Sequence, residues 1–314
     1  MARSQRKNKR MGRAGRIVLA AFATLLLFIL LLAGIGVVNA SMVRVRKAEV
    51  ILPDLPASFD GTRILYASDI DLCGLNTAAK AGALFDRLQS LEPDVLLLGG
   101  DYTAPSLLDV LNRGGEAADI AGKKLSARSD FFHYIGQFHA PLGKYAIAAP
   151  EDADRDTLTR QMSEAGVLPL FDDRVALRRG EDALWLVGVC EENAALNSAG
   201  SAFQRDDCVI VTAYGPAVLP VLLTSEASDG GQWSDLTLCG HTHGGQVRLF
   251  GRNMLPLNTQ EQRYRSGWTI ENYLPILITE GVGCEGLNLR LGTAPEVWLI
   301  TLRRQQIVSR ETIC

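Results

Sequence analysis

The sequence is poor in the residues that most often hold metals or crosslinks. Its 314 residues include four histidines and six cysteines, the latter at positions 73, 190, 208, 239, 284 and 314, and no two cysteines form a C-x-x-C pair. Several cysteines lie in strand-like runs, where buried thiols are common. Cys73 and Cys284 are the pair that could form a disulfide if the body is exported. No internal repeat or low-complexity tract occurs outside a basic N-terminal tail, so we count one domain.

Positive charge is scarce outside the first fifty residues. Residues 1–50 hold ten Lys and Arg and one acidic residue, Glu49, which leaves the rest with 22 basic and 34 acidic residues and a net charge of −12. An acidic body lacks the basic footprint of a nucleic-acid-binding protein. We therefore expect no nucleic-acid partner.

Residues 17–38 form an uncharged apolar run of 22 residues. As a helix, such a run crosses a hydrocarbon core of about 30 Å. Seven Lys and Arg precede it, within residues 1–16, and three follow it, within residues 39–47. The positive-inside rule then predicts a single-pass cell-membrane protein with a basic cytoplasmic tail, residues 1–16, and an extracytoplasmic C-terminal domain. A cleaved signal peptide is the alternative, although the run is longer than a usual signal-peptide core.

The body, residues 60–314, follows a linker and lead-in at 39–59 and alternates apolar strands with helices. Strands are expected at 63–68, 95–98, 144–149, 183–189, 209–212, 236–239, 275–279 and 297–302, and helices at 76–91, 129–138 and 217–223. Fully apolar strands joined by a helix are typical of a parallel sheet that is covered on both faces. The pattern predicts an α/β fold.

Two aspartates and two histidines fall at the ends of predicted strands. Asp69 and Asp101 follow the strands at 63–68 and 95–98, while His241 and His243 follow the strand at 236–239 and precede two glycines. Ligands of open α/β sheets bind at the carboxyl ends of the strands. The glycines let the loop turn sharply, so that both imidazoles can face one point. The pattern predicts a metal site; a polar turn that happens to contain histidines is the plainer interpretation.

Four motifs occur in order: Asp69-Ile70-Asp71, Gly100-Asp101, residues 141–146 (PLGKYA) and residues 240–246 (GHTHGGQ). Together they resemble the calcineurin-like metallophosphoesterases, in particular the membrane-anchored bacterial members, over residues 60–302. The resemblance implies a four-layer α/β/β/α sandwich, here preceded by one transmembrane helix, with two metal ions bridged at the edge of the sheets. It implies metal ligands at Asp69, Asp71, Asp101, His241 and His243.

The central motifs depart from the family pattern. Asp71 stands where the family has a histidine, and it can still bind a hard cation through oxygen. Pro150 stands where the family has a metal-ligand asparagine, and Glu151 stands where it has a histidine that acts as a general acid. Tyr214 stands in place of a lone histidine. Pro150 offers no ligand atom in its side chain.

The surviving ligands are divided unequally between the two metal positions. The first position keeps Asp69, Asp71, Asp101 and His243, whereas the second keeps only Asp101 and His241. Two protein ligands seldom hold a transition metal. The resemblance therefore predicts one divalent ion rather than two, from among Mn, Fe, Zn and Mg.

The resemblance implies a metal-dependent phosphoric ester hydrolase in which Asp101, His241 and Glu151 are the catalytic residues. Metal ions neutralise the charge on phosphoryl oxygens and convert water to hydroxide. The substrate would be a small-molecule or lipid phosphoester, and the membrane is the partner of the N-terminal helix. Two alternatives stay open: a catalytically dead pseudo-phosphoesterase that binds a phosphorylated ligand or a protein partner, and a structural ectodomain. A G-x-G-x-x-G match at 281–286 is not interpreted as a dinucleotide site, because no helix follows it.

Overall fold

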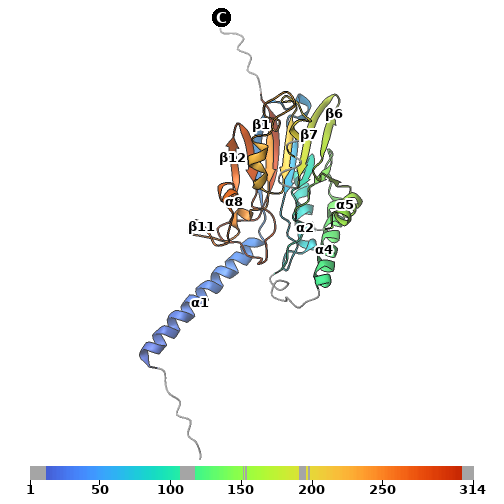
Figure 1. Cartoon of the computed structure of the whole chain (residues 1–314). Helices are drawn as coiled ribbons and strands as arrows, with labels where there is room; N and C mark the ends of the chain where they lie inside the picture. The colour runs from blue at the N-terminus through green and yellow to red at the C-terminus, as the bar shows by residue number, and fades with distance from the viewer. Residues whose placement is uncertain are drawn as a thin grey trace, which may run out of the picture.

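A computed structural model describes residues 12–106, 117–150, 152, 154–190, 196 and 199–305 (Figure 1). It begins with α1 (Arg13–Ala40), a helix of 28 residues whose side chains are mostly exposed. Within the described residues, α1 is the one helix long and apolar enough to cross a membrane. It contains the expected span 17–38 and projects from the rest of the molecule.

Two six-stranded sheets form the body. The first has the order β1-β14-β2-β3-β4-β5 and the second β12-β13-β9-β8-β7-β6. The strands of the first sheet are β1 (Arg44–Leu52), β14 (Glu296–Arg304), β2 (Arg63–Ala67), β3 (Val95–Leu98), β4 (Lys144–Ala146) and β5 (Leu168–Pro169). Those of the second are β12 (Gly267–Glu271), β13 (Leu274–Ile278), β9 (Leu236–Cys239), β8 (Val209–Ala213), β7 (Asp182–Val189) and β6 (Arg174–Arg179). A separate short hairpin pairs β10 (Arg248–Leu249) with β11 (Arg252–Asn253).

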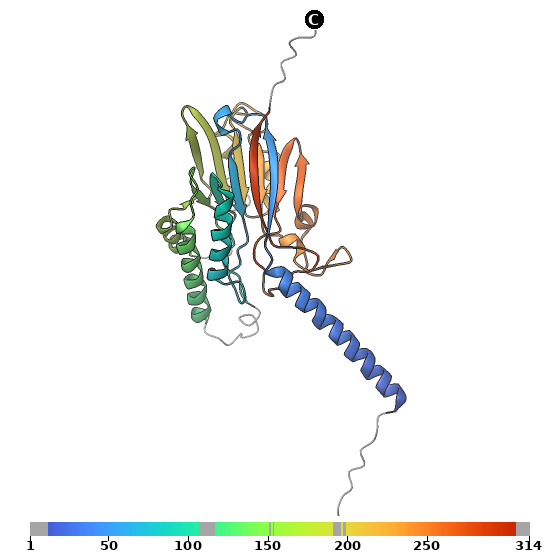
Figure 2. The ribbon, with the colours of Figure 1, turned by 180° about the vertical axis from the view of Figure 1, so that it is seen from behind.

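Helices cover the outer faces of the two sheets. Three of them, α2 (Ala78–Leu88), α4 (Ala117–Gln137) and α5 (Arg155–Glu164), lie against the first sheet, where Phe85 and Phe131 join its apolar core (Figure 2). The second sheet carries a thinner layer of short helices, η3 (Pro216–Val218), α7 (Leu219–Leu222) and α8 (Thr259–Arg263), over a separate apolar cluster. The predicted α/β sandwich of four layers is confirmed.

The direction of the strands decides which edge of the first sheet lies beside α1. β1 follows α1 and runs away from its end, and it pairs in parallel with β14, which is antiparallel to β2. β2 therefore runs back toward α1. The carboxyl ends of β2 and of its parallel neighbours β3 and β4 lie at the end of the body from which α1 leaves. This end of the two sheets is here called the α1 edge.

Several elements differ from the sequence-based expectation. The segment 39–59, expected as a linker and lead-in, contains β1, whose first half is exposed and carries Arg44, Arg46 and Lys47. Charged side chains are common on edge strands, and they conceal the apolar alternation by which strands are recognised. α4 begins at Ala117 instead of 129 and includes Gly122, where a Cβ would meet nothing within 4 Å.

Candidate metal centre

The loops at the α1 edge hold their polar residues in a strained backbone conformation. Six of these residues have φ in the left-handed region: Asp69 at 53°, Asp71 at 48°, Asp101 at 57°, His241 at 76°, His243 at 49° and Gln246 at 47°. Such values are uncommon outside glycine and tend to gather at functional sites. The concentration of strain in these loops marks the edge as a site.

Three of the predicted ligands come together at this edge. One ligand atom from each of Asp69, Asp101 and His243 lies within 4.8 Å of the other two. Asp69 follows β2, Asp101 follows β3, and His243 follows β9 of the second sheet. Two carboxylates and an imidazole are donors that suit Mn, Fe, Zn or Mg.

Asp71 lies beside this group, and its burial without hydrogen bonds is the environment in which a bound cation would stabilise a carboxylate. It is fully buried, and neither carboxylate oxygen has a hydrogen-bond partner among the described residues. Its Oδ2 atom lies 3.6 Å from Nδ1 of His243. Burial, followed by the charge of Asp69, raises the pKa of Asp71 well above its usual range. A buried carboxylate without partners is costly, so these residues fit a bound cation.

Asp69 is fixed by the backbone of the histidine loop. Both of its carboxylate oxygens accept from the N–H of His241, at 2.9 and 3.0 Å. Burial raises the pKa of Asp69 to about 6, although this hydrogen bond acts to lower it. Gly240 allows the approach, because a Cβ there would lie 2.7 Å from Oδ2 of Asp69.

His243 is held by a buried arginine that the sequence analysis did not single out. Arg290 is fully buried; its Nη1 donates to the carbonyl oxygen of His243 at 3.2 Å, and its Nη2 lies 3.2 Å from Nδ1 of the same residue. Burial, and then the charge of Arg290, lowers the pKa of His243 well below its usual value. The imidazole is therefore neutral, as a metal ligand must be.

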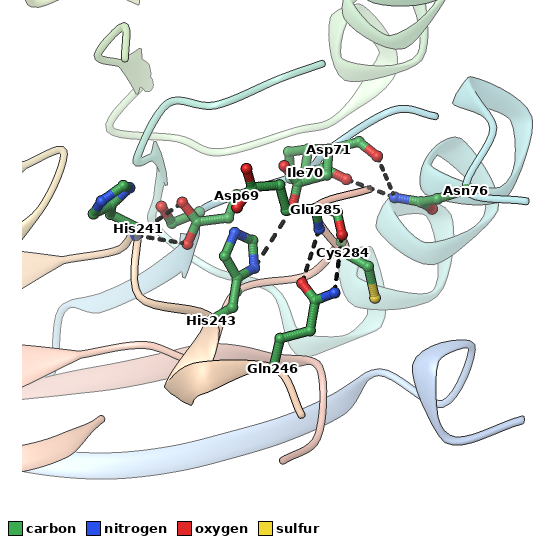
Figure 3. Close-up of polar contacts among 12 residues, drawn as sticks. Asp69, Ile70, Asp71, Asn76, His241, His243, Gln246, Cys284 and Glu285 are labelled. Atoms are coloured by element: carbon green, nitrogen blue, oxygen red, sulfur yellow. Dashed lines mark hydrogen bonds and ion pairs between the residues drawn. The ribbon is translucent and has the colours of Figure 1, made fainter. Parts of the chain in front are cut away.

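His241 does not join this group. Its ring points away from Asp69 (Figure 3), and its Nε2 lies 3.2 Å from Oε1 of Glu261 on α8. The ring centroids of His241 and Tyr214 are 4.6 Å apart. Pro150, Tyr214, His241 and Glu261 line one cavity of about 400 Å³. The residues expected at the family's second metal position, Pro150, Tyr214 and His241, thus line one cavity beside the three-residue group.

The other predicted acid of this region is outside the described residues. This acid is Glu151; its neighbour Asp152 is described and buried, and it accepts from the backbone N–H groups of Asp101, Tyr102 and Ala149, at 2.9, 3.0 and 2.9 Å. Asp152 therefore positions the Asp101 loop.

The glycine loop at 281–286 packs against the aspartates. The N–H of Gly283 donates to the carbonyl oxygen of Asp69 at 2.7 Å, and a Cβ on Gly283 would lie 2.4 Å from Cβ of Asp71. Gln246 joins the same loop to the histidine motif, because its side chain accepts from the N–H of Glu285 at 2.9 Å (Figure 3). The Sγ atom of Cys73 lies 3.6 Å from the carbonyl oxygen of Cys284, so these cysteines adjoin, and both carry thiols in the structure.

The last turns of α1 contact the loop that carries Arg290. The N–H of Arg290 donates to the carbonyl oxygen of Gly36 at 3.0 Å. Nδ2 of Asn39 donates to the carbonyl oxygens of Arg290 and Thr293, at 3.1 and 2.6 Å. The membrane-crossing candidate is thus connected to His243 through one residue, Arg290.

Comparison with known proteins identifies several relatives. The chain is 28% identical over 213 residues to the phosphodiesterase YaeI of Escherichia coli (strain K12), an alignment that covers 67% of this chain and 71% of that protein. It is 25% identical over 285 residues to a Danio rerio transmembrane protein with metallophosphoesterase domain, covering 87% of this chain and 60% of that protein. It is 22% identical over 279 residues to the uncharacterized metallophosphoesterase YkoQ of Bacillus subtilis (strain 168), covering 82% of this chain and 90% of that protein.

The fold and the site define an α/β sandwich protein with a candidate metal site. These relatives support a place for the chain in the metallophosphoesterase family. No family model matches it. A solved structure of the phosphopantetheinyl hydrolase PptH from Mycobacterium tuberculosis aligns at a TM-score of 0.35 and 10% identity, over 73% of this chain and 91% of that one, a likeness too distant to support an argument. The chain spans 60% of the Danio rerio relative and 60% of a Bos taurus relative of the same name. Both are named as transmembrane proteins, and together with the apolar helix α1 these names suggest a membrane protein.

Proposed function

We propose that the chain is a membrane-anchored phosphoesterase that hydrolyses a phosphoester at a reduced metal site with one divalent ion. The observation that carries this proposal is the meeting of Asp69, Asp101 and His243 within 4.8 Å, next to the buried carboxylate of Asp71, which has no hydrogen-bond partner among the described residues. A relative is named a phosphodiesterase, which supports a phosphodiester as the substrate class.

The four residues of the first metal position would hold the ion, with Asp71 supplying oxygen in place of the family's imidazole. A bound ion supplies charge neutralisation and water activation. Arg290 keeps His243 oriented and neutral, while Asp152 keeps the Asp101 loop in place. The cavity of about 400 Å³ beside His241 offers room for a substrate group. His241, half-exposed and paired with Glu261, borders both the cavity and the ligand group.

The lost ligands support one ion instead of two. Pro150 and Tyr214 both line the cavity, and the Nε2 atom of His241 is engaged by Glu261. A single ion lacks the second charge that a two-ion site applies to the phosphoryl group, so turnover should be well below that of a family member with both ions.

The test uses the full-length protein in detergent, first freed of metal with a chelator. Metal content after reloading with Mn and hydrolysis of an aryl phosphodiester are measured on the wild type and on Asp101→Asn. The proposal expects about one ion per chain and slow turnover, both lost in Asp101→Asn. Pro150→Asn with Tyr214→His should raise the metal content toward two ions and increase turnover. Two ions and fast turnover in the wild type would show that replacement ligands exist.

A second candidate is a pseudo-phosphoesterase that binds a phosphorylated ligand without cleaving it. The turning of the His241 ring toward Glu261 favours this candidate, because the residue is then engaged outside the ligand group. Metal binding and phosphate binding without turnover, in both the wild type and Pro150→Asn with Tyr214→His, would support it over the first.

A further inference from the structure

The hairpin β10–β11 carries an aromatic residue that its own fold does not require. The turn between the two strands consists of Phe250 and Gly251, with φ of 52° and 77°. Two-residue turns with positive φ at both central positions favour Asn, Asp or Gly, and a bulky residue there is strained. The Phe250 side chain is fully exposed, so it contributes no packing within the described chain. Its full exposure at the tip leaves the ring free to contact a surface outside the chain.

The surroundings of the tip are apolar and basic. Met254 and Leu255 follow the hairpin and are 49% and 43% exposed. Arg248 and Arg252 lie in its strands, and residues 246–260 contain no acidic residue. Exposed apolar and aromatic side chains flanked by arginine are the composition of segments that lie in the headgroup region of a bilayer.

The hairpin is attached to the end of α1. The N–H of Arg248 donates to the carbonyl oxygen of Leu291 at 2.7 Å, and the neighbouring N–H of Arg290 donates to the carbonyl oxygen of Gly36. Gly36 lies within the apolar run 17–38, so the hairpin is connected to a residue of the membrane-crossing candidate itself. Figure 1 places β11 beside the upper end of α1. Leu287, 52% exposed, lies in the same loop as Leu291 and adds to this surface.

We propose that the segment 248–255, together with Leu287, is a membrane-contact surface that lies in the headgroup region of the bilayer crossed by α1. The continuity with α1 identifies the bilayer as the occupant, and the exposed Arg252 favours anionic headgroups. Because the α1 edge also carries Asp69, Asp101 and His243, this contact holds the candidate metal centre close to the membrane surface. The inference concerns a surface and does not depend on catalytic activity.

The chain offers a matched control at the opposite end of the second sheet. Tyr273 also lies in a two-residue turn, between β12 and β13, has a φ of 68° and is almost fully exposed. β13 runs parallel to β9, whose carboxyl end leads to the histidines, so the turn that precedes β13 lies away from the α1 edge. Phe250→Trp and Tyr273→Trp therefore compare two similar turns that differ in their distance from the proposed membrane.

The experiment uses the full-length protein in lipid nanodiscs and measures the quenching of tryptophan emission by brominated lipids, relative to the parent with its four tryptophans. The tryptophan introduced by Phe250→Trp should show blue-shifted emission and added quenching, stronger for bromine near the headgroup than for bromine deep in the chain. Quenching should increase when phosphatidylglycerol replaces part of the phosphatidylcholine. Tyr273→Trp should add none.

Three results would overturn the inference. In the first, Phe250→Trp adds no quenching over the parent. In the second, both variants are quenched equally, which indicates a non-specific approach of the whole body to the bilayer. In the third, Phe250→Trp emission is blue-shifted without quenching, which indicates that the tip is covered by protein, for example by a second copy of the chain.

Discussion

Asp71 is the residue whose substitution best separates metal binding from folding. Its buried carboxylate has no hydrogen-bond partner among the described residues, so its charge opposes folding until a cation binds. In the presence of a chelator at pH 8, Asp71→Asn should raise the free energy of unfolding by about 1 kcal/mol or more. The same variant should bind Mn more weakly. Chemical denaturation and metal titration measure the two effects, which have opposite signs.

Asp152→Asn is the control for that experiment. The Asp152 carboxylate is also buried, but it accepts three backbone N–H groups. Its substitution should lower the free energy of unfolding with and without metal. If Asp71→Asn destabilised the metal-free protein as Asp152→Asn is expected to, the role of Asp71 would be structural.

Asp69 predicts a pH dependence of the metal-free protein. Burial raises its pKa to about 6, from an ordinary value of 3.8. The folded state therefore holds the proton more tightly than the unfolded state, so its stabilising contribution is complete below about pH 4 and is lost as the pH rises to about 6. A shift of this size corresponds to about 3 kcal/mol. In chelator, the free energy of unfolding of the wild type should fall by this amount relative to Asp69→Asn between these pH values; a constant difference would contradict the assignment.

At the residue scale, the sequence motifs predicted the candidate ligands better than the residues that position those ligands. Asp69, Asp101 and His243 were predictable because each follows an apolar strand within a short motif. Arg290 and Glu261 were not, since each meets its histidine only through the tertiary fold, 47 and 20 residues away. The orientation of the His241 ring also depends on its contact with Glu261, and no local sequence pattern predicts that contact.

At the scale of elements, α1 and the loop 287–293 form a contact that can be tested by matched substitutions. A Cβ on Gly36 would lie 2.7 Å from Cγ of Leu289, whereas a Cβ on Gly34 would meet nothing within 4 Å. Gly36→Leu should displace the loop, move Arg290 and weaken metal binding by about tenfold, as is typical when a residue that orients a ligand is disturbed.

Gly34→Leu provides the control, because it adds the same apolar side chain to the same helix without a collision. Membrane insertion should be unchanged in both variants, while Mn affinity should fall only in Gly36→Leu. Equal affinity in the two variants would show that α1 does not position the metal centre.

Prediction of the elements from sequence succeeded where the pattern was local. The side chain of Thr77 caps α2. The strand β3 has the predicted bounds, because a continuous apolar run flanked by Pro93 and two glycines has few alternatives. β1 was not recognised, since an exposed edge strand lacks a buried face over most of its length. The start of α4 was missed because a glycine inside a helix costs only about 1 kcal/mol and does not end it.

At the scale of the whole molecule, the distribution of basic residues around the apolar run predicts on which side of the membrane the body lies. Seven Lys and Arg lie within residues 1–16, before the apolar run, and three follow it closely. Short basic segments are retained on the cytoplasmic side, so the body should be extracytoplasmic. The hydrogen bonds of Gly36 and Asn39 to the loop 287–293 support an anchor that stays attached, because cleavage near Ala40 would remove both partners.

An alkaline phosphatase fused after Cys314 should be active in cells, because this enzyme folds only outside the cytoplasm. A green fluorescent protein at the same position should be dark, because it becomes fluorescent only inside the cytoplasm. Replacing the seven basic residues of the tail with serine should reduce phosphatase activity and increase fluorescence, since the charge asymmetry would then favour the opposite orientation. An inactive phosphatase together with a fluorescent fusion in the unmodified chain would reverse the topology. It would place the metal centre on the cytoplasmic face, still at the α1 edge and still beside the bilayer, because that placement depends on the contacts of α1 with the body and not on the direction of insertion.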